Sequence, residues 1–230
     1  MKKIGMIVAI ETDAIFNYYG YVERLKSPSG YELFLHRGDN YKIYFLHCGM
    51  GTVAAAAGTQ FLIDRCKVDL IVDFGVVGGL TDKMKVQKVV VVERIVHYRY
   101  DASEFMDLKK GQLPGKKDTF LHTDKNLVKK VLSLNKEIKK ATIASGDKFV
   151  STAEEKAAIH KDFKCDICDM ESAGIVLTCE ANDVPCLLLK AVSDGLMGGA
   201  NEFWEELNRV SLICLEITTE IIKELVKEEQ

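Results

Sequence analysis

The chain has 230 residues, of which 47% are hydrophobic and 28% are charged, and its formal net charge is −3. A chain of this length and composition buries a core of its own, so its fold needs no metal or disulfide to hold it together. The slightly acidic balance argues against a nucleic-acid partner, which normally selects a basic excess. No apolar run approaches the roughly 20 residues that span a bilayer, so we expect a cytoplasmic protein without a membrane partner.

The seven cysteines indicate a reducing compartment, because their number is odd and several lie in apolar runs, where cysteine behaves as a small hydrophobic residue. Cys165 and Cys168 have CxxC spacing, but no second pair of ligands accompanies them at a spacing suited to zinc. The five histidines are scattered along the chain. We therefore expect neither a metal nor a cofactor.

Strands and helices are predicted to alternate. The first apolar run, residues 4–10, is predicted to be a strand covered on both faces rather than a secretory signal, because it meets Glu11 and Asp13 at once. A hairpin is then predicted at residues 31–36 and 41–47, followed by a helix of small residues at 52–66. A buried strand that runs into glycines is predicted at 70–79, and a strand rich in β-branched residues at 86–92.

The second half begins with a long polar connection, residues 98–118, whose length is typical of functional or mobile loops. A helix, a strand, a helix and a strand are predicted next, at residues 125–140, 141–145, 171–182 and 186–192. Apolar residues then recur every three or four positions from Leu207 to Leu225, which predicts an amphipathic helix. The pattern predicts one α/β domain over residues 1–230, with a mixed, mostly parallel twisted sheet flanked by helices on both sides.

Ligands in such sheets bind where strands end. Polar or glycine-rich residues follow five of the predicted strands, at Asp13 and at residues 49–51, 75–79, 145–147 and 193–194. Residues 75–79 have neither the Lys-Ser/Thr ending of a phosphate loop nor dinucleotide-binding spacing. Their glycines are predicted only to let the backbone approach a flat ligand closely.

Two carboxylates stand out among these positions. Asp194 follows an apolar strand almost directly, and partial desolvation there would raise its pKa and suit it to act as an acid near neutral pH. Glu171 opens a predicted helix. From position alone, Asp194 is equally well explained as a helix cap, and Glu171 is better explained as an acid that is stabilised in the first turn of a helix.

Seven short segments, spread along nearly the whole chain, carry further motifs. They are residues 4–11, 49–56, 75–79, 111–115, 145–150, 169–173 and 190–194. In this order they resemble the 5′-methylthioadenosine/S-adenosylhomocysteine nucleosidases, within the nucleoside phosphorylase superfamily. The Met170-Glu171 and Ser193-Asp194 pairs are the specific motifs. The resemblance implies a nucleoside phosphorylase-like fold and cleavage of the bond between a purine and a ribose.

The resemblance also implies roles for individual residues. Asp194 would protonate or hydrogen-bond N7 of the purine and so make the base a better leaving group. Phe149 would stack on the base while backbone groups at Val150 read its edge. Met170 and Glu171 would hold the ribose, where carboxylates stabilise the positive charge that develops on the sugar.

The attacking side of the site departs from the family pattern. The carboxylate that activates water would fall on Asp13, where the family usually has Glu; Glu11 is nearby at an offset that does not match. A misplacement of about 1 Å can cost roughly 10²-fold in rate. The family's usual Arg is Lys190 here, which keeps the charge without the planar fork, and a Ser of its glycine-rich loop is Val76.

Further substrate contacts are implied at Ile10, Met50, Val76, Val77, Gly78, Lys190, Ser193 and Phe203. Relatives are usually homodimers. The resemblance therefore also implies a homodimer in which the loop at residues 105–114, with Phe105, Met106 and Pro114, covers the partner's 5′-pocket.

Several functions remain compatible with these residues. Water would hydrolyse a nucleoside such as 5′-methylthioadenosine or S-adenosylhomocysteine, whereas a phosphorylase would need cations to hold phosphate, and Lys190 is the only obvious one among the motifs. A nucleoside-binding protein that has lost turnover is a third reading, motivated by the departures at Asp13, Val76 and Lys190. Another purine nucleoside is also open, although Asp194 in place of Asn implies a 6-aminopurine.

Overall fold

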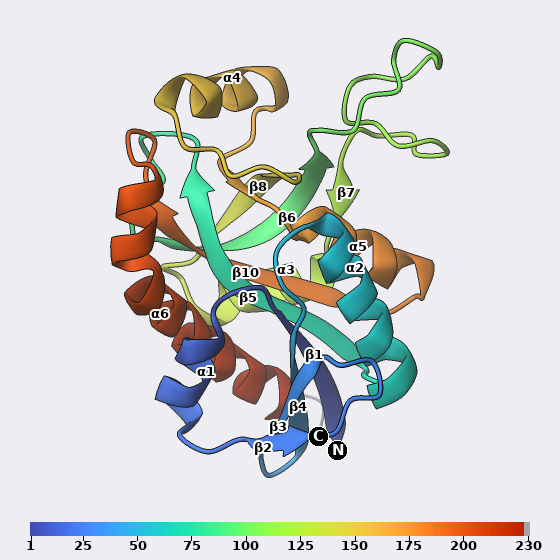
Figure 1. The fold of residues 1–230 in the computed structure, drawn as a ribbon, viewed down its shortest axis with the longest axis vertical. Coiled ribbons are helices and arrows are strands. Elements are labelled where there is room, and N and C mark those ends of the chain that lie inside the picture. Colours follow the sequence, from blue (N-terminus) through green and yellow to red (C-terminus); the bar gives the residue numbers. More distant parts are fainter. Residues whose placement is uncertain (228–230) are drawn as a thin grey trace.

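Ten strands and six α-helices make up the computed structural model, which describes residues 1–227 (Figure 1). The strands are β1 (Lys2–Val8), β2 (Glu23–Leu25), β3 (Glu32–Arg37), β4 (Tyr41–His47), β5 (Leu70–Gly79), β6 (Val89–His97), β7 (Leu121–His122), β8 (Lys139–Ser145), β9 (Ile167–Asp169) and β10 (Cys186–Asp194). The helices are α1 (Thr12–Tyr19), α2 (Thr52–Phe61), α3 (Lys125–Leu134), α4 (Ala153–Phe163), α5 (Ser172–Ala181) and α6 (Ala200–Lys227). A π-helical turn, Leu62–Cys66, continues α2.

The strands form one mixed sheet that partly closes on itself. Strand β5 pairs in parallel with both β1 and β10, while β10 pairs with β6, β6 with β8, β8 with β9, and β9 returns to β5. These five strands form a closed ring, and β4, β3 and β2 extend the sheet beyond β1. Within residues 1–227, five pairings are parallel and five antiparallel.

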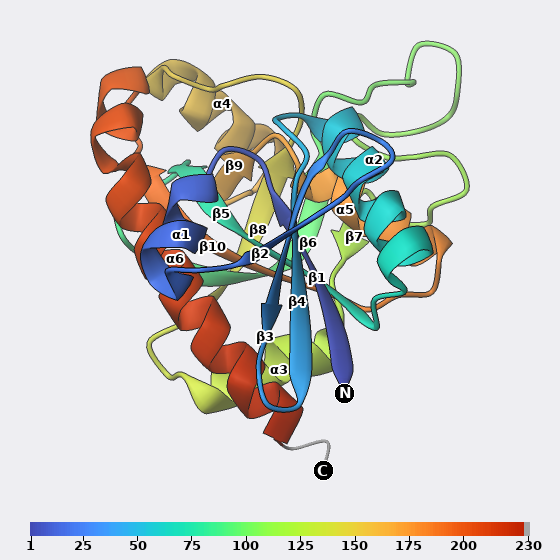
Figure 2. The same ribbon diagram turned by 60° about the horizontal axis from the view of Figure 1, so that its bottom comes forward.

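Helices cover the sheet on both sides, as predicted. Helices α1 and α6 pack together on one side, and α2 and α5 lie side by side on the other (Figure 1 and Figure 2). The apolar stripe predicted in the last helix is buried, with Val210, Cys214, Ile221 and Leu225 in the core. Among the described residues, no helix combines the length and the apolar character needed to cross a membrane.

Some local predictions need correction. The helix predicted at residues 125–140 ends at Leu134, because Asn135 has an extended backbone (φ −132°, ψ 108°), and Lys139 already begins β8. Helices α1 and α4 were not predicted. Helix α4 shows little apolar periodicity, since only Ile159, Phe163 and Lys156 are buried in it. The connection at residues 98–120 projects from the body of the molecule in both views.

The parallel strands β1, β5 and β10 position the candidate site. Their carboxyl ends meet at one edge of the sheet, which is where ligands bind in folds of this kind. Residues 9–11, 76–79 and 193–194 lie at or just beyond these three ends.

Candidate active site

A pocket opens at this edge. Its lining comes from the ends of β1, β5 and β10, the segment that follows β8, the start of α5 and one side of α6. The residues are Ala9, Ile10, Glu11, Met50, Val76, Val77, Gly78, Lys148, Phe149, Val150, Cys168, Asp169, Met170, Glu171, Ser193, Asp194 and Phe203.

Most of the predicted site residues share this pocket. The structure brings together Asp194, Glu171, Phe149, Val150, Met170, Ser193, Val76, Val77, Gly78, Met50, Ile10 and Phe203. Asp13 and Lys190 are not part of the lining, and where the structure places each of them is described below. Lys148, Cys168, Asp169 and Glu11 line the pocket without having been singled out from the sequence.

Asp194 is held at the end of β10, where the strand is irregular. The register against β5 shifts between Val192 and Asp194, and such bulges re-aim a side chain beside many active sites. The Asp194 carboxylate accepts a hydrogen bond from Ser193 Oγ at 2.9 Å and one from Lys156 Nζ at 2.5 Å. Burial raises the pKa of Asp194 above its ordinary value, although Lys156 and Ser193 act in the opposite direction. This environment suits a group that donates a proton near neutral pH.

Glu171 lies across the pocket at the start of α5. Its carboxylate accepts hydrogen bonds from the backbone N–H of Gly51 at 2.8 Å and of Met170 at 3.2 Å. Burial and the neighbouring charge of Asp169 raise the pKa of Glu171, against the effects of Lys190 and the Gly51 N–H. The two N–H donors fix the direction of the carboxylate and leave it room to accept from hydroxyls of a ligand.

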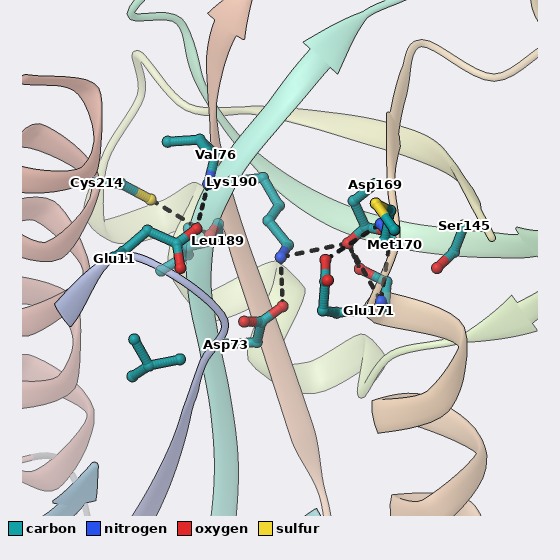
Figure 3. Close-up of polar contacts among 12 residues, drawn as sticks. Glu11, Asp73, Val76, Ser145, Asp169, Met170, Glu171, Leu189, Lys190 and Cys214 are labelled. Atoms are coloured by element: carbon teal, nitrogen blue, oxygen red, sulfur yellow. Dashed lines mark hydrogen bonds and ion pairs between the residues drawn. The ribbon is translucent and has the colours of Figure 1, made fainter. Parts of the chain in front are cut away.

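Lys190 is not part of the pocket lining; its side chain extends between Asp73 and Asp169 (Figure 3). Its Nζ is 2.5 Å from Asp73 Oδ2 and 3.3 Å from Asp169 Oδ2, and the three side chains are almost completely buried. Burial lowers the pKa of Lys190, but the charges of Asp73, Asp169 and Glu171 outweigh it and raise that pKa above its usual value. In this structure the Lys190 ammonium group therefore serves as the counter-charge of two buried carboxylates.

Replacing Lys190 with Met is expected to lower the free energy of unfolding by about 3–5 kcal/mol, because Asp73 and Asp169 would remain buried without their counter-charge. Urea denaturation followed by circular dichroism measures the loss. The double variant Lys190→Met/Asp73→Asn should recover part of it. As a control, Lys140→Met removes a surface ion pair to Glu93, which is worth at most about 1 kcal/mol. Equal losses for Lys190→Met and Lys140→Met would contradict the inference.

The carboxylate beyond β1 that lines the pocket is that of Glu11, and Figure 3 shows it beside Val76. Glu11 is 6% exposed, and it accepts hydrogen bonds from the backbone N–H of Val76 at 3.1 Å and of Ile10 at 3.0 Å. Asp13 is exposed in the first turn of α1 and lies outside the pocket. A side chain two positions further along a helix points in a different direction, so the residue matched to the family motif faces solvent.

Gly75 explains how two charged groups fit beside β5. A Cβ at this position would lie 3.0 Å from Glu11 Oε1 and 3.2 Å from Lys190 Nζ. Glycine therefore leaves the space through which Glu11 and Lys190 approach the same stretch of backbone. Carboxylates of Glu11, Asp73, Asp169 and Glu171 surround this one ammonium.

Aromatic rings border the opposite end of the pocket. Phe149 and Phe203 meet edge to face with their centroids 5.2 Å apart, and Phe203 meets Trp204 in the same way at 5.1 Å. Phe149 is 40% exposed, so one face of its ring is free to stack on a planar ligand.

The residues predicted to cover a partner's pocket lie elsewhere. Phe105, Met106 and Pro114 all lie on the projecting connection at residues 98–120, where the two larger apolar side chains, Phe105 and Met106, are exposed. None of the three lines the pocket of its own chain.

Among the described residues, no group of three or more His, Cys, Asp or Glu side chains is arranged to hold a metal ion.

Sequence reasoning missed the buried partners of the site. Asp73 and Lys190 each interrupt an apolar strand, and a charge within a strand covered on both faces requires a partner. The signal indicates that each charge has a partner, but only the structure shows that β5 and β10 are adjacent and that the two charges pair with each other. Lys156 gave no comparable signal, since it lies in a polar run of α4.

The chain matches the family model of the phosphorylase superfamily over residues 3–227. It therefore belongs to that superfamily, which is the class that its fold and pocket define.

Individual relatives narrow the assignment. A 5′-methylthioadenosine/S-adenosylhomocysteine nucleosidase of Haemophilus influenzae is 33% identical over 169 residues, covering 71% of this chain and 73% of the relative. The crystal structure of the Helicobacter pylori enzyme of that name, with butyl-thio-DADMe-Immucillin-A, has a TM-score of 0.90 at 26% identity, covering 97% of this chain and 99% of that one. A mutant of the H. pylori enzyme with 5′-methylthioadenosine in its active site has a TM-score of 0.90 at 25% identity, with coverage of 97% and 99%. The chain is a member of the 5′-methylthioadenosine/S-adenosylhomocysteine nucleosidase family, as its motifs predicted.

Proposed function

We propose that the chain hydrolyses the N-glycosidic bond of an adenine nucleoside such as 5′-methylthioadenosine or S-adenosylhomocysteine, releasing adenine and a ribose derivative. The observation that carries this proposal is the pairing, in one pocket, of a buried acid at Asp194 with carboxylates at Glu11 and Glu171. Family membership supports it, because relatives of this name include one with 5′-methylthioadenosine in its active site.

Different residues of the pocket act on the base and on the sugar. Asp194 donates to the departing base, with Phe149 stacked on its face. Glu171 accepts from the ribose hydroxyls and, with Glu11, offsets the positive charge that builds on the sugar. Glu11 is the base that activates the attacking water. Its two backbone hydrogen bonds hold its carboxylate in place before the substrate arrives.

Water is favoured over phosphate as the nucleophile because the floor of the pocket is acidic. A phosphate dianion would have to approach Glu11, Glu171 and Asp169. Lys190, the cation nearest to them, is already engaged by Asp73 and Asp169. The backbone N–H of Val76 already donates to Glu11. The Val76 side chain has no hydroxyl that could donate to phosphate. Like charges at this range repel, and the repulsion is strong where water is excluded.

A nucleoside panel with and without phosphate tests the proposal. Adenine release from 5′-methylthioadenosine, S-adenosylhomocysteine and adenosine is followed by chromatography in buffer with no phosphate and in buffer with phosphate added. We expect release at equal rates in both buffers, with a free sugar as the second product. A sugar 1-phosphate would show a phosphorylase, and tight binding without release would show a nucleoside-binding protein.

We further propose that the chain acts as a cytoplasmic homodimer. Large apolar side chains are exposed on the projecting connection, at Phe105, and at the start of α2, at Met50 and Val53, and exposed apolar groups of this kind mark protein interfaces when they adjoin. Light scattering should give twice the 25.7 kDa mass of one chain. The mass of a single chain at micromolar concentration would contradict the proposal.

A further inference from the structure

A buried ammonium group lies directly behind Asp194. Lys156, in the first turn of α4, has no exposed surface. Its Nζ donates to Asp194 Oδ2 at 2.5 Å, to the carbonyl oxygen of Gly195 at 2.7 Å and to that of Gly198 at 2.9 Å. An ammonium group has three protons, so each of them has one acceptor in this structure. Lys156 does not line the pocket, so it acts on a ligand only through the groups that it binds.

The position of Lys156 is one that an apolar residue would ordinarily fill. Ile159 and Phe163, three and seven residues further along α4, are buried on the same side of the helix. A buried ion pair is often no more stabilising than well-packed apolar side chains. Gly78 leaves space beside the acid, since a Cβ there would lie 3.1 Å from Cys168 Sγ and 3.3 Å from Asp194 Oδ2.

The environment of Asp194 is set from several elements. Lys156 on α4 and Ser193 on β10 lower the pKa of Asp194, while burial and the charge of Glu202 on α6 raise it, and burial dominates. Cys168 on β9 also faces Asp194, but burial raises the pKa of its thiol, so it stays neutral. Lys156 is therefore the group that opposes the effect of burial most strongly.

Building on the proposed nucleosidase activity, we propose that Lys156 is a positioning residue for departure of the base: it aims the Asp194 carboxyl at the purine and stabilises the carboxylate that forms there. The bond between C1′ and N9 breaks and its electron pair passes to the purine. The proton of the Asp194 carboxyl goes to N7, and the negative charge left on Asp194 then faces the Lys156 ammonium. The cation left at C1′ is taken up by the attacking water, whose proton goes to Glu11.

The same ammonium also orders the turn that leads to the aromatic wall. It binds two carbonyl groups of the turn at residues 195–198, and the Gly195 N–H donates to Glu202 Oε2 at 2.8 Å. Helix α6 begins directly after this turn and carries Phe203 against Phe149. Lys156 thus connects the acid to the wall on which the base would stack.

Steady-state rates of adenine release from 5′-methylthioadenosine, measured between about pH 5 and pH 9, test this role. We expect Lys156→Met to lower kcat roughly 10- to 100-fold with a smaller change in KM, as a misaimed group does. Loss of the Lys156 charge should also raise the pKa of Asp194, so the alkaline limb of the kcat/KM profile should move to higher pH by about one unit. Lys161→Met, an exposed residue of the same helix, should leave both unchanged.

A second pair of variants separates positioning from folding. In an Asp194→Asn background, Lys156→Met should cause no further loss of kcat, because no carboxyl remains to be aimed. That double variant carries no unpaired buried charge, so it can be compared with Asp194→Asn even where Lys156→Met alone does not fold. An unshifted alkaline limb, or a further loss of kcat when Lys156→Met is added to Asp194→Asn, would overturn the inference alone. Absence of turnover by the unaltered enzyme would overturn the proposed function, and the inference with it.

Discussion

Asp194→Asn is expected to slow adenine release by about 10²–10⁴-fold, the usual contribution of a general acid, while nucleoside binding persists. The asparagine keeps the shape of the side chain and one acceptor for Lys156, but its amide is not an acid. Single-turnover adenine release measures the chemical step, and calorimetric titration with 5′-methylthioadenosine measures binding. The effect should fall on kcat more than on KM, because the proton is transferred only as the bond breaks.

The variant needs two controls. Removing the Asp194 charge leaves the buried Lys156 ammonium without its counter-charge, which lowers stability, so the melting temperature must be compared before the rates are. Asp162→Asn changes an exposed residue of α4 and should not alter turnover. Turnover of Asp194→Asn within about threefold of the unaltered enzyme, far less than an acid contributes, would remove Asp194 from the mechanism.

Glu11→Gln is expected to lower kcat by about 10²–10⁴-fold, as loss of the base that activates water would, whereas Asp13→Asn should leave the rate within about twofold. The introduced amide would still accept from the Val76 N–H but could not take a proton. The two variants are matched, since each replaces one carboxylate by its amide, and the positions are two residues apart. Rates at saturating 5′-methylthioadenosine decide between them.

The opposite result would be equally informative. A large loss for Asp13→Asn with little change for Glu11→Gln would mean that the family motif, not the geometry of the pocket, identifies the base. The first turn of α1 would then have to rotate when the substrate binds, because Asp13 is exposed in this structure. Comparable losses in both variants would indicate that both carboxylates take part in activating the water.

The base-leaving half of the site was predictable because its residues adjoin strand ends and short motifs. Asp194 is the last residue of β10 and Phe149 follows β8 within a few residues, so their positions relative to the strand ends could be taken from the sequence. Glu11 was less accessible to such reasoning. Whether Glu11 or Asp13 faces the pocket depends on where α1 begins, and helix starts are among the least certain features of a sequence.

The buried ion pairs were harder to predict, since they depend on contacts between distant segments. Lys156 and Asp194 are 38 positions apart in the chain. The local sequence pattern of α4 does not indicate that Lys156 lies on the buried side of the helix. The fold shows the same division. Alternating strands and helices were evident, whereas closure of the ring depends on β5 pairing with both β9 and β10, which lie far along the chain.

That closed ring also governs how the protein behaves towards its neighbours. Each ring strand has partners on both sides, so the strands that carry the site present no free row of N–H and C=O groups to another chain. Within residues 1–227 the sheet ends at β2, which has three residues, and at β7, which has two. Edges that are short, and charged as β2 is at Glu23 and Arg24, are poor templates for adding strands. The architecture that fixes the site thereby also limits aggregation through the sheet.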